Sequence, residues 1–219
     1  MLVRCKRDGV GVPGVLGADW EAGWLVLEWV EGRTVRAVLD EWAEGVKNGG
    51  EEGDREIRGL MERVGRCVGR LHDIGVCHGD LTTSNLMLRA PERKEGEEGQ
   101  GSRARGRLTT SEMRMLAEDG GFPPAPEVEA RSGGQRSLEG EVILIDFGLA
   151  SHSTQNLQDE DRAVDLYVLE RAFAATHPAA EPLFKEVLRA YGESFKGAKT
   201  VLRRLEDVRL RGRKRSMLG

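Results

Sequence analysis

Two short polar motifs, each next to a β-favouring stretch, constrain this chain of 219 residues more than any other feature. The first motif reads His-Gly-Asp-Leu-Thr-Thr-Ser-Asn over residues 78–85, and the second reads Asp-Phe-Gly over residues 146–148. The apolar run at residues 141–146 is typical of a buried strand and leads directly into the second motif. The order strand, loop, insertion, strand predicts a hairpin with a long tip between the motifs.

The residue types in these motifs suit phosphoryl transfer from a nucleotide. That reaction needs a carboxylate beside the attacking hydroxyl and oxygen ligands for Mg²⁺. The spacing Asp-x-x-x-x-Asn puts Asp80 and Asn85 on one loop, and Asp146 ends a strand. We predict that Asp80 is the catalytic base and that Asn85 and Asp146 hold the metal. Either triplet alone is a weak signal, whereas both in this order and context are specific.

The two motifs resemble the catalytic loop and the metal-binding motif of the protein-kinase superfamily. On this resemblance residues 24–32 look like the kinase hinge, with Leu27 as the gatekeeper. The backbone of Glu28 and Val30 would then pair with adenine, and Met87 would form the apolar floor beneath the ring. Plain strand core is the alternative for Val26, Leu27 and Val30, and a core methionine is the alternative for Met87.

A finer resemblance is to the PRPK family, the small atypical serine/threonine kinases of the KEOPS/EKC complex. It is carried by residues 78–85, 145–149, 165–171 and 209–219. The resemblance implies a kinase or ATPase, with ATP and Mg²⁺ as cofactors, that supports threonylcarbamoyladenosine formation in tRNA. The implied partners are the threonylcarbamoyl-transferase subunit, the small subunits of the complex, and tRNA through the basic tail.

The chain departs from ordinary protein kinases at two places. Gly79 stands where an Arg normally grips a phosphorylated activation loop, so we do not expect phosphate-driven ordering. Only 19 positions separate Asp146 from Asp165 (165 − 146), which leaves little room for a peptide-docking platform. By resemblance Asp165 braces the catalytic-loop backbone, and a charge at a helix N-terminus is the alternative.

The Gly-rich loop and the lysine with which a kinase binds the nucleotide phosphates have no counterpart in the sequence. Residues 9–14 spell G-x-G-x-x-G, but Pro13 interrupts them and the next lysine is Lys47, beyond the hinge. Residues 192–200 nearly spell a phosphate-binding loop, but no buried strand leads into them. We therefore expect an N-terminally truncated kinase whose activity alone is weak, because electrostatic grip on the phosphates carries much of this catalysis.

The predicted fold class is α+β: a protein-kinase-like fold with a mostly helical C-lobe, the hinge and a remnant of the N-lobe sheet. Residues 1–32 would be the N-lobe remnant and hinge, and residues 33–219 the C-lobe. Within the C-lobe the composition predicts a disordered insertion at about 91–140 and a basic tail at 203–219. Apolar periodicity and end signals predict helices near residues 34–43, 55–73, 160–176, 179–192 and 196–206.

Charge and composition limit the other functions. The net charge of −4 argues against a global field for nucleic acid, so any RNA contact depends on the local basic tail. A solvated flexible end is the alternative for that tail. Three cysteines favour a reducing compartment, and the sequence has neither a signal peptide nor a long apolar run. We expect a cytoplasmic and nuclear protein with no membrane association.

Three alternatives remain beside the kinase hypothesis. Cys67, His72, Cys77 and His78 invite a zinc site, but their spacing fits no standard ligand pattern, so we favour structural roles. A catalytically impaired, pseudokinase-like scaffold subunit would fit the missing phosphate grip. A small-molecule kinase is disfavoured, because such enzymes usually carry a large helical substrate domain.

Overall fold

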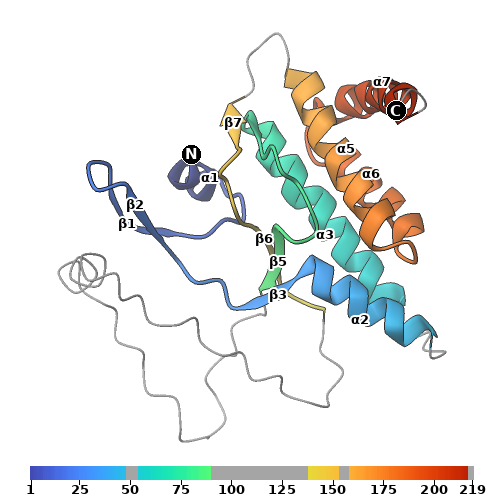
Figure 1. Cartoon of the computed structure of the whole chain (residues 1–219), viewed down its shortest axis with the longest axis horizontal. Helices are drawn as coiled ribbons and strands as arrows, with labels where there is room; N and C mark the ends of the chain where they lie inside the picture. Colours follow the sequence, from blue (N-terminus) through green and yellow to red (C-terminus); the bar gives the residue numbers. More distant parts are fainter. Residues whose placement is uncertain (48–53, 90–137, 153–157, 217–219) are drawn as a thin grey trace, which may run out of the picture.

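The computed structural model describes residues 1–47, 54–89, 138–152 and 158–216 (Figure 1). These residues form a mixed structure of helices and small antiparallel sheets. The helices are α1 (Leu2–Arg7), α2 (Val35–Lys47), α3 (Asp54–Asp73), α5 (Gln158–Thr176), the 3₁₀ turn η1 (Glu181–Leu183), α6 (Phe184–Gly192) and α7 (Ala198–Ser216). The strands are β1 (Val15–Asp19), β2 (Trp24–Leu27), β3 (Gly32–Thr34), β4 (Val76–Cys77), β5 (Leu86–Arg89), β6 (Glu141–Leu144) and β7 (Ser151–His152).

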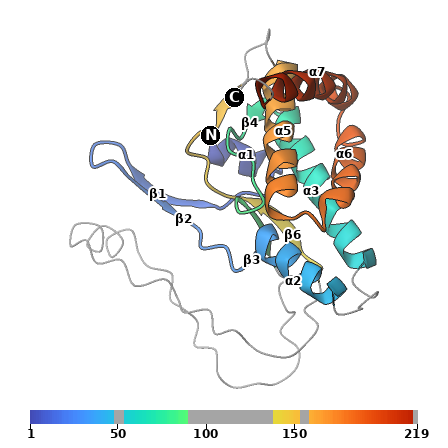
Figure 2. The same ribbon diagram turned by 45° about the vertical axis from the view of Figure 1, so that its right-hand side comes forward.

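The strands pair in three antiparallel groups. β1 and β2 form a hairpin that projects from the rest of the chain in both views (Figures 1 and 2). β3, β5 and β6 form a three-stranded sheet with β5 in the centre. β4 pairs with β7. The predicted hairpin is therefore confirmed, because Leu86 of β5 lies opposite Leu144 of β6. In this register the end of the first motif, just before β5, lies near the start of the second motif, just after β6.

The helical part is organised around α3, whose apolar stripe is buried. Its fully buried side chains include Ile57, Leu60, Val64 and Leu71. α6 packs closely against α3, and α7 lies across α5 (Figure 2). A Cβ atom at Gly65 would lie only 2.3 Å from the carbonyl oxygen of Val187 in α6. Glycine at this position thus permits the close contact between the two helices.

Local sequence signals set the helix ends near the site. The hydroxyl of Thr34 accepts a hydrogen bond from the Ala37 N–H at 3.1 Å, as expected of an N-cap residue. α3 ends at Asp73, and Gly75 follows with a φ of 76°. The predictions for these two helices are confirmed, although α2 continues to Lys47, beyond the expected end near residue 43.

Three expectations need correction or stay open. β2 ends at Leu27, so the predicted strand is shorter than residues 24–30. α7 continues to Ser216, so residues 203–216 are helical, and the helix does not end near 206. Most of the predicted insertion lies outside the described residues. Within the described part of the chain, no helix is long and apolar enough to cross a membrane.

Candidate active site

The first motif forms a loop between β4 and β5 that holds Asp80 against Asn85. The side-chain Nδ2 of Asn85 donates to Asp80 Oδ2 at 3.1 Å and to the Asp80 carbonyl at 2.9 Å. Gly79 has a φ of 82°, and a Cβ atom there would lie 2.4 Å from the Leu149 carbonyl oxygen. The tight loop therefore requires glycine where ordinary kinases have arginine.

The second motif is fastened to the first by backbone and ring contacts. The N–H of Ile145 donates to the Asn85 carbonyl at 3.0 Å. His78 Nε2 lies 2.9 Å from the Ile145 carbonyl, and its ring centroid lies 5.0 Å from that of Phe147. Asp146 itself has a φ of 61°, unusual for a residue other than glycine. The structure thus joins Asp80, Asn85 and the backbone leading to Asp146 in one unit.

A largely apolar pocket of about 520 Å³ opens in front of Asp146. Leu27 lies in its wall with 37% of its surface exposed, so Leu27 is not plain strand core. The volume lies within the range of about 300–1,000 Å³ that is usual for small-molecule sites. The lining residues are Met1, Leu2, Val3, Pro13, Val15, Ala18, Trp20, Leu25, Leu27, Asp146, Phe147 and Gly148.

The other residues assigned to adenine do not line this pocket. Val30 is buried at 6% exposure, and Met87 lies in β5 opposite Thr34 and Ile143. Glu28 donates from its N–H to the Gly14 carbonyl at 2.8 Å. The proposed backbone contacts of Glu28 and Val30, and the proposed role of Met87, therefore stay predictions.

The carboxylate of Glu28 has a structural role that sequence reasoning missed. It accepts hydrogen bonds from the Gly14 N–H at 2.7 Å and from Arg89 at 2.6 Å. The bond from Gly14, assisted by the charge of Arg89, lowers the pKa of Glu28 below its ordinary value. Glu28 therefore ties the end of β2 to β5 and to the segment that contains the G-x-G-x-x-G spelling.

That spelling has a packing role in this structure. Val10 and Val12 are buried, and the Gly11 carbonyl accepts a hydrogen bond from Leu144 at 2.8 Å. A Cβ atom at Gly11 would lie 2.3 Å from the Val142 carbonyl oxygen. The segment thus packs directly along β6. This position agrees with the expectation that residues 9–14 are not a phosphate-binding loop.

Asp165 of α5 braces the catalytic loop, as predicted. Its carboxylate accepts hydrogen bonds from the backbone N–H of His78 at 2.5 Å and from that of Gly79 at 2.9 Å. Burial raises the pKa of Asp165, but the hydrogen bonds from His72 and from these two N–H groups outweigh it and leave the pKa below its ordinary value. The ionised carboxylate therefore fixes the loop backbone beside Asp80.

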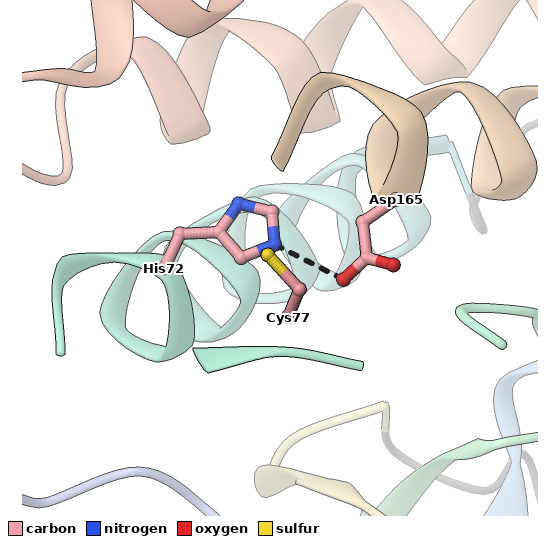
Figure 3. A group of neighbouring side chains, drawn as sticks. All are labelled: His72, Cys77 and Asp165. Atoms are coloured by element: carbon pink, nitrogen blue, oxygen red, sulfur yellow. Dashed lines mark hydrogen bonds and ion pairs between the residues drawn. The ribbon is translucent and has the colours of Figure 1, made fainter. Parts of the chain in front are cut away.

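Behind this carboxylate lies a buried cluster of His72, Cys77 and Asp165 (Figure 3). Their ligand atoms lie within 4.8 Å of one another, the geometry of a possible metal site. However, His72 Nε2 lies 3.3 Å from Asp165, and His72 Nδ1 lies 2.8 Å from the Tyr191 hydroxyl. Burial lowers the pKa of His72, so the neutral ring donates to Asp165 and accepts from Tyr191. Because both ring nitrogens are engaged, we interpret the cluster as structural support.

A second buried histidine supports the loop from the other side. His177 Nε2 lies 3.0 Å from the Thr83 hydroxyl, and His177 Nδ1 lies 3.0 Å from the carboxylate of Asp40 in α2. Thr83 is itself only 2% exposed. This chain of contacts could not be predicted from the sequence, where a histidine just after a helix end is its local signal.

Three basic residues of α7 are engaged with acidic residues of the protein. Arg209 bonds to Glu170 of α5 at 2.8 Å, and Arg211 contacts Glu160 of the same helix. Arg204 also pairs with Glu160, at 3.5 Å. Residues 203–212 therefore do not form the free, flexible basic end that was the alternative for this tail.

Comparisons with known proteins bear on the fold and the family of this chain. Residues 15–100 match the family model "Lipopolysaccharide kinase (Kdo/WaaP) family". A solved structure titled "WaaP in complex with acyl carrier protein" superposes with a TM-score of 0.52 at 18% identity, covering 92% of this chain and 66% of that one. This likeness confirms the predicted kinase-like fold class.

Curated relatives are much more similar in sequence. The chain is 49% identical to the "EKC/KEOPS complex subunit bud32" of Aspergillus fumigatus and 50% identical to that of Aspergillus clavatus, over 100% of this chain and 73% of each relative. An EKC/KEOPS complex subunit of Schizosaccharomyces pombe is 34% identical over 100% of this chain and 69% of its own length. The segments that carried the finer resemblance thus lie within matches that extend over the full chain.

Proposed function

Because the chain belongs to the Bud32 family of EKC/KEOPS complex subunits, a family of protein-kinase-like proteins, we propose that it binds Mg²⁺-ATP and transfers or hydrolyses the γ-phosphate. The observation that carries this proposal is the unit formed by Asp80, Asn85 and the backbone before Asp146. It would supply a carboxylate base and two oxygen ligands at adjoining positions, the set that phosphoryl transfer requires.

The side chains fit a magnesium ion. Asn85 uses its Nδ2 on Asp80, and because the amide is planar its Oδ1 lies on the opposite arm, available as a ligand. Asp146 is exposed at the pocket, where its carboxylate would be the second ligand. Hard oxygen donors of this kind are what Mg²⁺ prefers. When bound, the ion would neutralise charge that builds on the phosphates.

Asp80 would orient the attacking hydroxyl or water and accept its proton. Its carboxylate is partly exposed and is held in place by Asn85, while Asp165 fixes the backbone on its N-terminal side. Leu27 in the pocket wall would contact the adenine ring, and the backbone of Glu28 and Val30, outside the pocket lining, would supply the hydrogen-bonding edge. Met87 would approach the ring from β5.

The proposal is tested by nucleotide binding and turnover with matched variants. We expect Asp146→Asn to weaken Mg²⁺-dependent binding of a fluorescent ATP analogue and to abolish ADP release. Asp80→Asn should leave binding intact and abolish ADP release. Asp73→Asn, a change of the same type at an exposed site, should alter neither. Unchanged turnover in Asp80→Asn and Asp146→Asn would refute the proposal.

One observation favours a second candidate, a non-catalytic scaffold subunit. Among the described residues that line the pocket there is no lysine to grip phosphates. Complementation separates the two candidates: a cell whose only copy carries Asp146→Ala loses function if the subunit is an enzyme and keeps it if the subunit is a scaffold.

Within the complex, the protein would support threonylcarbamoyladenosine formation in tRNA. Its partners would be the threonylcarbamoyl-transferase subunit and the small subunits, in the cytoplasm and the nucleus. Because Arg204, Arg209 and Arg211 are engaged with α5, exposed Arg203 would be the tRNA contact among the described side chains of this part of α7. Such phosphate contacts predict RNA binding that weakens steeply with added salt.

A further inference from the structure

A second pocket, of about 330 Å³, lies between α3, β6 and the segment that contains Gly11. It shares no lining residue with the candidate active site. α3 and β6 are neighbours in both ribbon views (Figures 1 and 2). The lining residues are Gly11, Arg63, Arg66, Cys67, Arg70, Gly140, Glu141 and Val142.

The pocket is strongly basic for a protein with a net charge of −4. Arg63, Arg66 and Arg70 lie three and four residues apart, so they share one face of α3. Glu141 is the only carboxylate among the lining residues, and it lies 3.8 Å from Arg89. Arg66 has one exposed partner on its own helix, Glu62 at 3.5 Å. Within the described residues Arg70 makes no ion pair.

Arg63 is the most informative of the three, because its guanidinium is only partly satisfied. Its Nη2 donates to the Leu138 carbonyl, but its buried Nε has no hydrogen-bond partner among the described residues. Burial, followed by the nearby charge of Arg66, lowers the pKa of Arg63 from its ordinary value, against the opposing charges of Glu139, Glu56 and Glu62. These carboxylates offset the partial burial of Arg63 only in part, so a further anion at the guanidinium would be stabilising.

We propose that this pocket is a binding site for a phosphate-bearing anion, held by the guanidinium groups of Arg63, Arg66 and Arg70. Three arginines and one carboxylate line the pocket, and Glu62 pairs with Arg66 at 3.5 Å, which still leaves positive charge for a compact anion such as a phosphate. The planar guanidinium also bonds phosphate oxygens in pairs. Burial raises the pKa of Cys67 to about 12, so the thiol at the pocket wall stays neutral and does not repel the anion.

The site is tested by NMR with inorganic pyrophosphate as the probe. ¹H–¹⁵N spectra of the full chain resolve arginine Nε–H groups, and EDTA keeps metal out of the candidate active site. We expect saturable shifts of the Nε–H signals of Arg63, Arg66 and Arg70. Because a hydrogen bond to a charged group contributes about 1.5–3 kcal/mol, Arg63→Gln or Arg70→Gln should each weaken binding by about tenfold or more.

Arg58→Gln is the matched control, because Arg58 is exposed on α3 outside the pocket. It should leave pyrophosphate affinity unchanged. Arg70→Gln changes an exposed side chain, so its effect is separable from folding, and the thermal midpoint of each variant checks this separation. Absence of saturable shifts at the three arginines, or an equal loss of affinity in Arg58→Gln, would overturn the proposal.

A competition experiment identifies the source of the phosphate. If a short single-stranded RNA displaces pyrophosphate, and Arg70→Gln weakens RNA binding, the natural ligand is an RNA backbone. If RNA does not compete, the ligand is a small free phosphate compound. Both results support the site. The pyrophosphate measurements do not depend on ATP turnover, so they test this site separately from the proposed function.

Discussion

Replacement of Asp165 by alanine tests the support of the catalytic loop. The side chain is the shared acceptor for the backbone N–H groups of His78 and Gly79 and for the ring of His72. Because Asp165 is 2% exposed and His72 is fully buried, these donors have little access to water once the carboxylate is removed. Asp165→Ala therefore strands up to three donors at once.

The size of the effect follows from that count. A buried donor that loses its partner costs about 1–3 kcal/mol, and water that enters the new cavity recovers part of it. We expect a loss of about 3–5 kcal/mol in the free energy of unfolding, the sum for up to three unpaired donors less the part that water recovers. That is a large part of the roughly 5–15 kcal/mol of a typical domain. Asp165→Asn keeps the shape and one acceptor, so it should cost about 1–3 kcal/mol.

Urea denaturation followed by circular dichroism at pH 7.5 measures these free energies. The control is Asp207→Ala, which removes an exposed ion pair with Arg204 and should change stability by less than about 0.5 kcal/mol. Asp165→Asn should also reduce ADP release more than Asp207→Ala does, because the loop backbone beside Asp80 loses its brace. Loss of less than 1 kcal/mol in Asp165→Ala, with normal turnover, would show that the loop does not depend on Asp165.

Three further predictions concern the same scaffold. Gly79→Ala should lower the thermal midpoint by several degrees and impair turnover, because its Cβ would meet the Leu149 carbonyl oxygen; a fully active, equally stable variant contradicts this. Burial lowers the folded-state pKa of His177 below its ordinary 6.5 despite the charge of Asp40. The unfolded chain therefore binds the proton first as pH falls, and the urea midpoint should drop between pH 7.5 and 5.5, less so in His177→Gln. Thr34→Ala removes the N-cap of α2 and should lower the free energy of unfolding, measured by urea titration, by about 0.5–2 kcal/mol. An unchanged free energy of unfolding would contradict the capping role of Thr34.

Features that depend on residues close in sequence could be predicted from the sequence. Asp80 and Asn85 lie on one short loop, so their spacing alone indicated that they meet, and the structure joins them by a hydrogen bond. The approach of Asp146 followed from the hairpin of β5 and β6. The role of Asp165 came from the family resemblance, because nothing local indicates that a helix residue reaches the loop.

Features that depend on distant partners could not be predicted. His72 and Tyr191 are 119 positions apart, so no local pattern shows that they pair. The full length of α7 was missed for the same reason, since Arg209 and Arg211 are held by acidic residues of α5. Periodicity of apolar residues shows that a helix face is buried, but it does not show which polar group on the other element is its partner.

The central claim is that Asp80, Asn85 and Asp146 share one metal–nucleotide site, and paramagnetic broadening tests it most directly. Mn²⁺ would replace Mg²⁺ in the presence of an unhydrolysable ATP analogue while ¹H–¹⁵N spectra of the chain are recorded. The predicted result is selective loss of the Asn85 side-chain signal and of the Asp80 and Asp146 amide signals. In Asp146→Asn this broadening should be weaker. Broadening centred elsewhere, or the same pattern in Asp146→Asn, would contradict the claim.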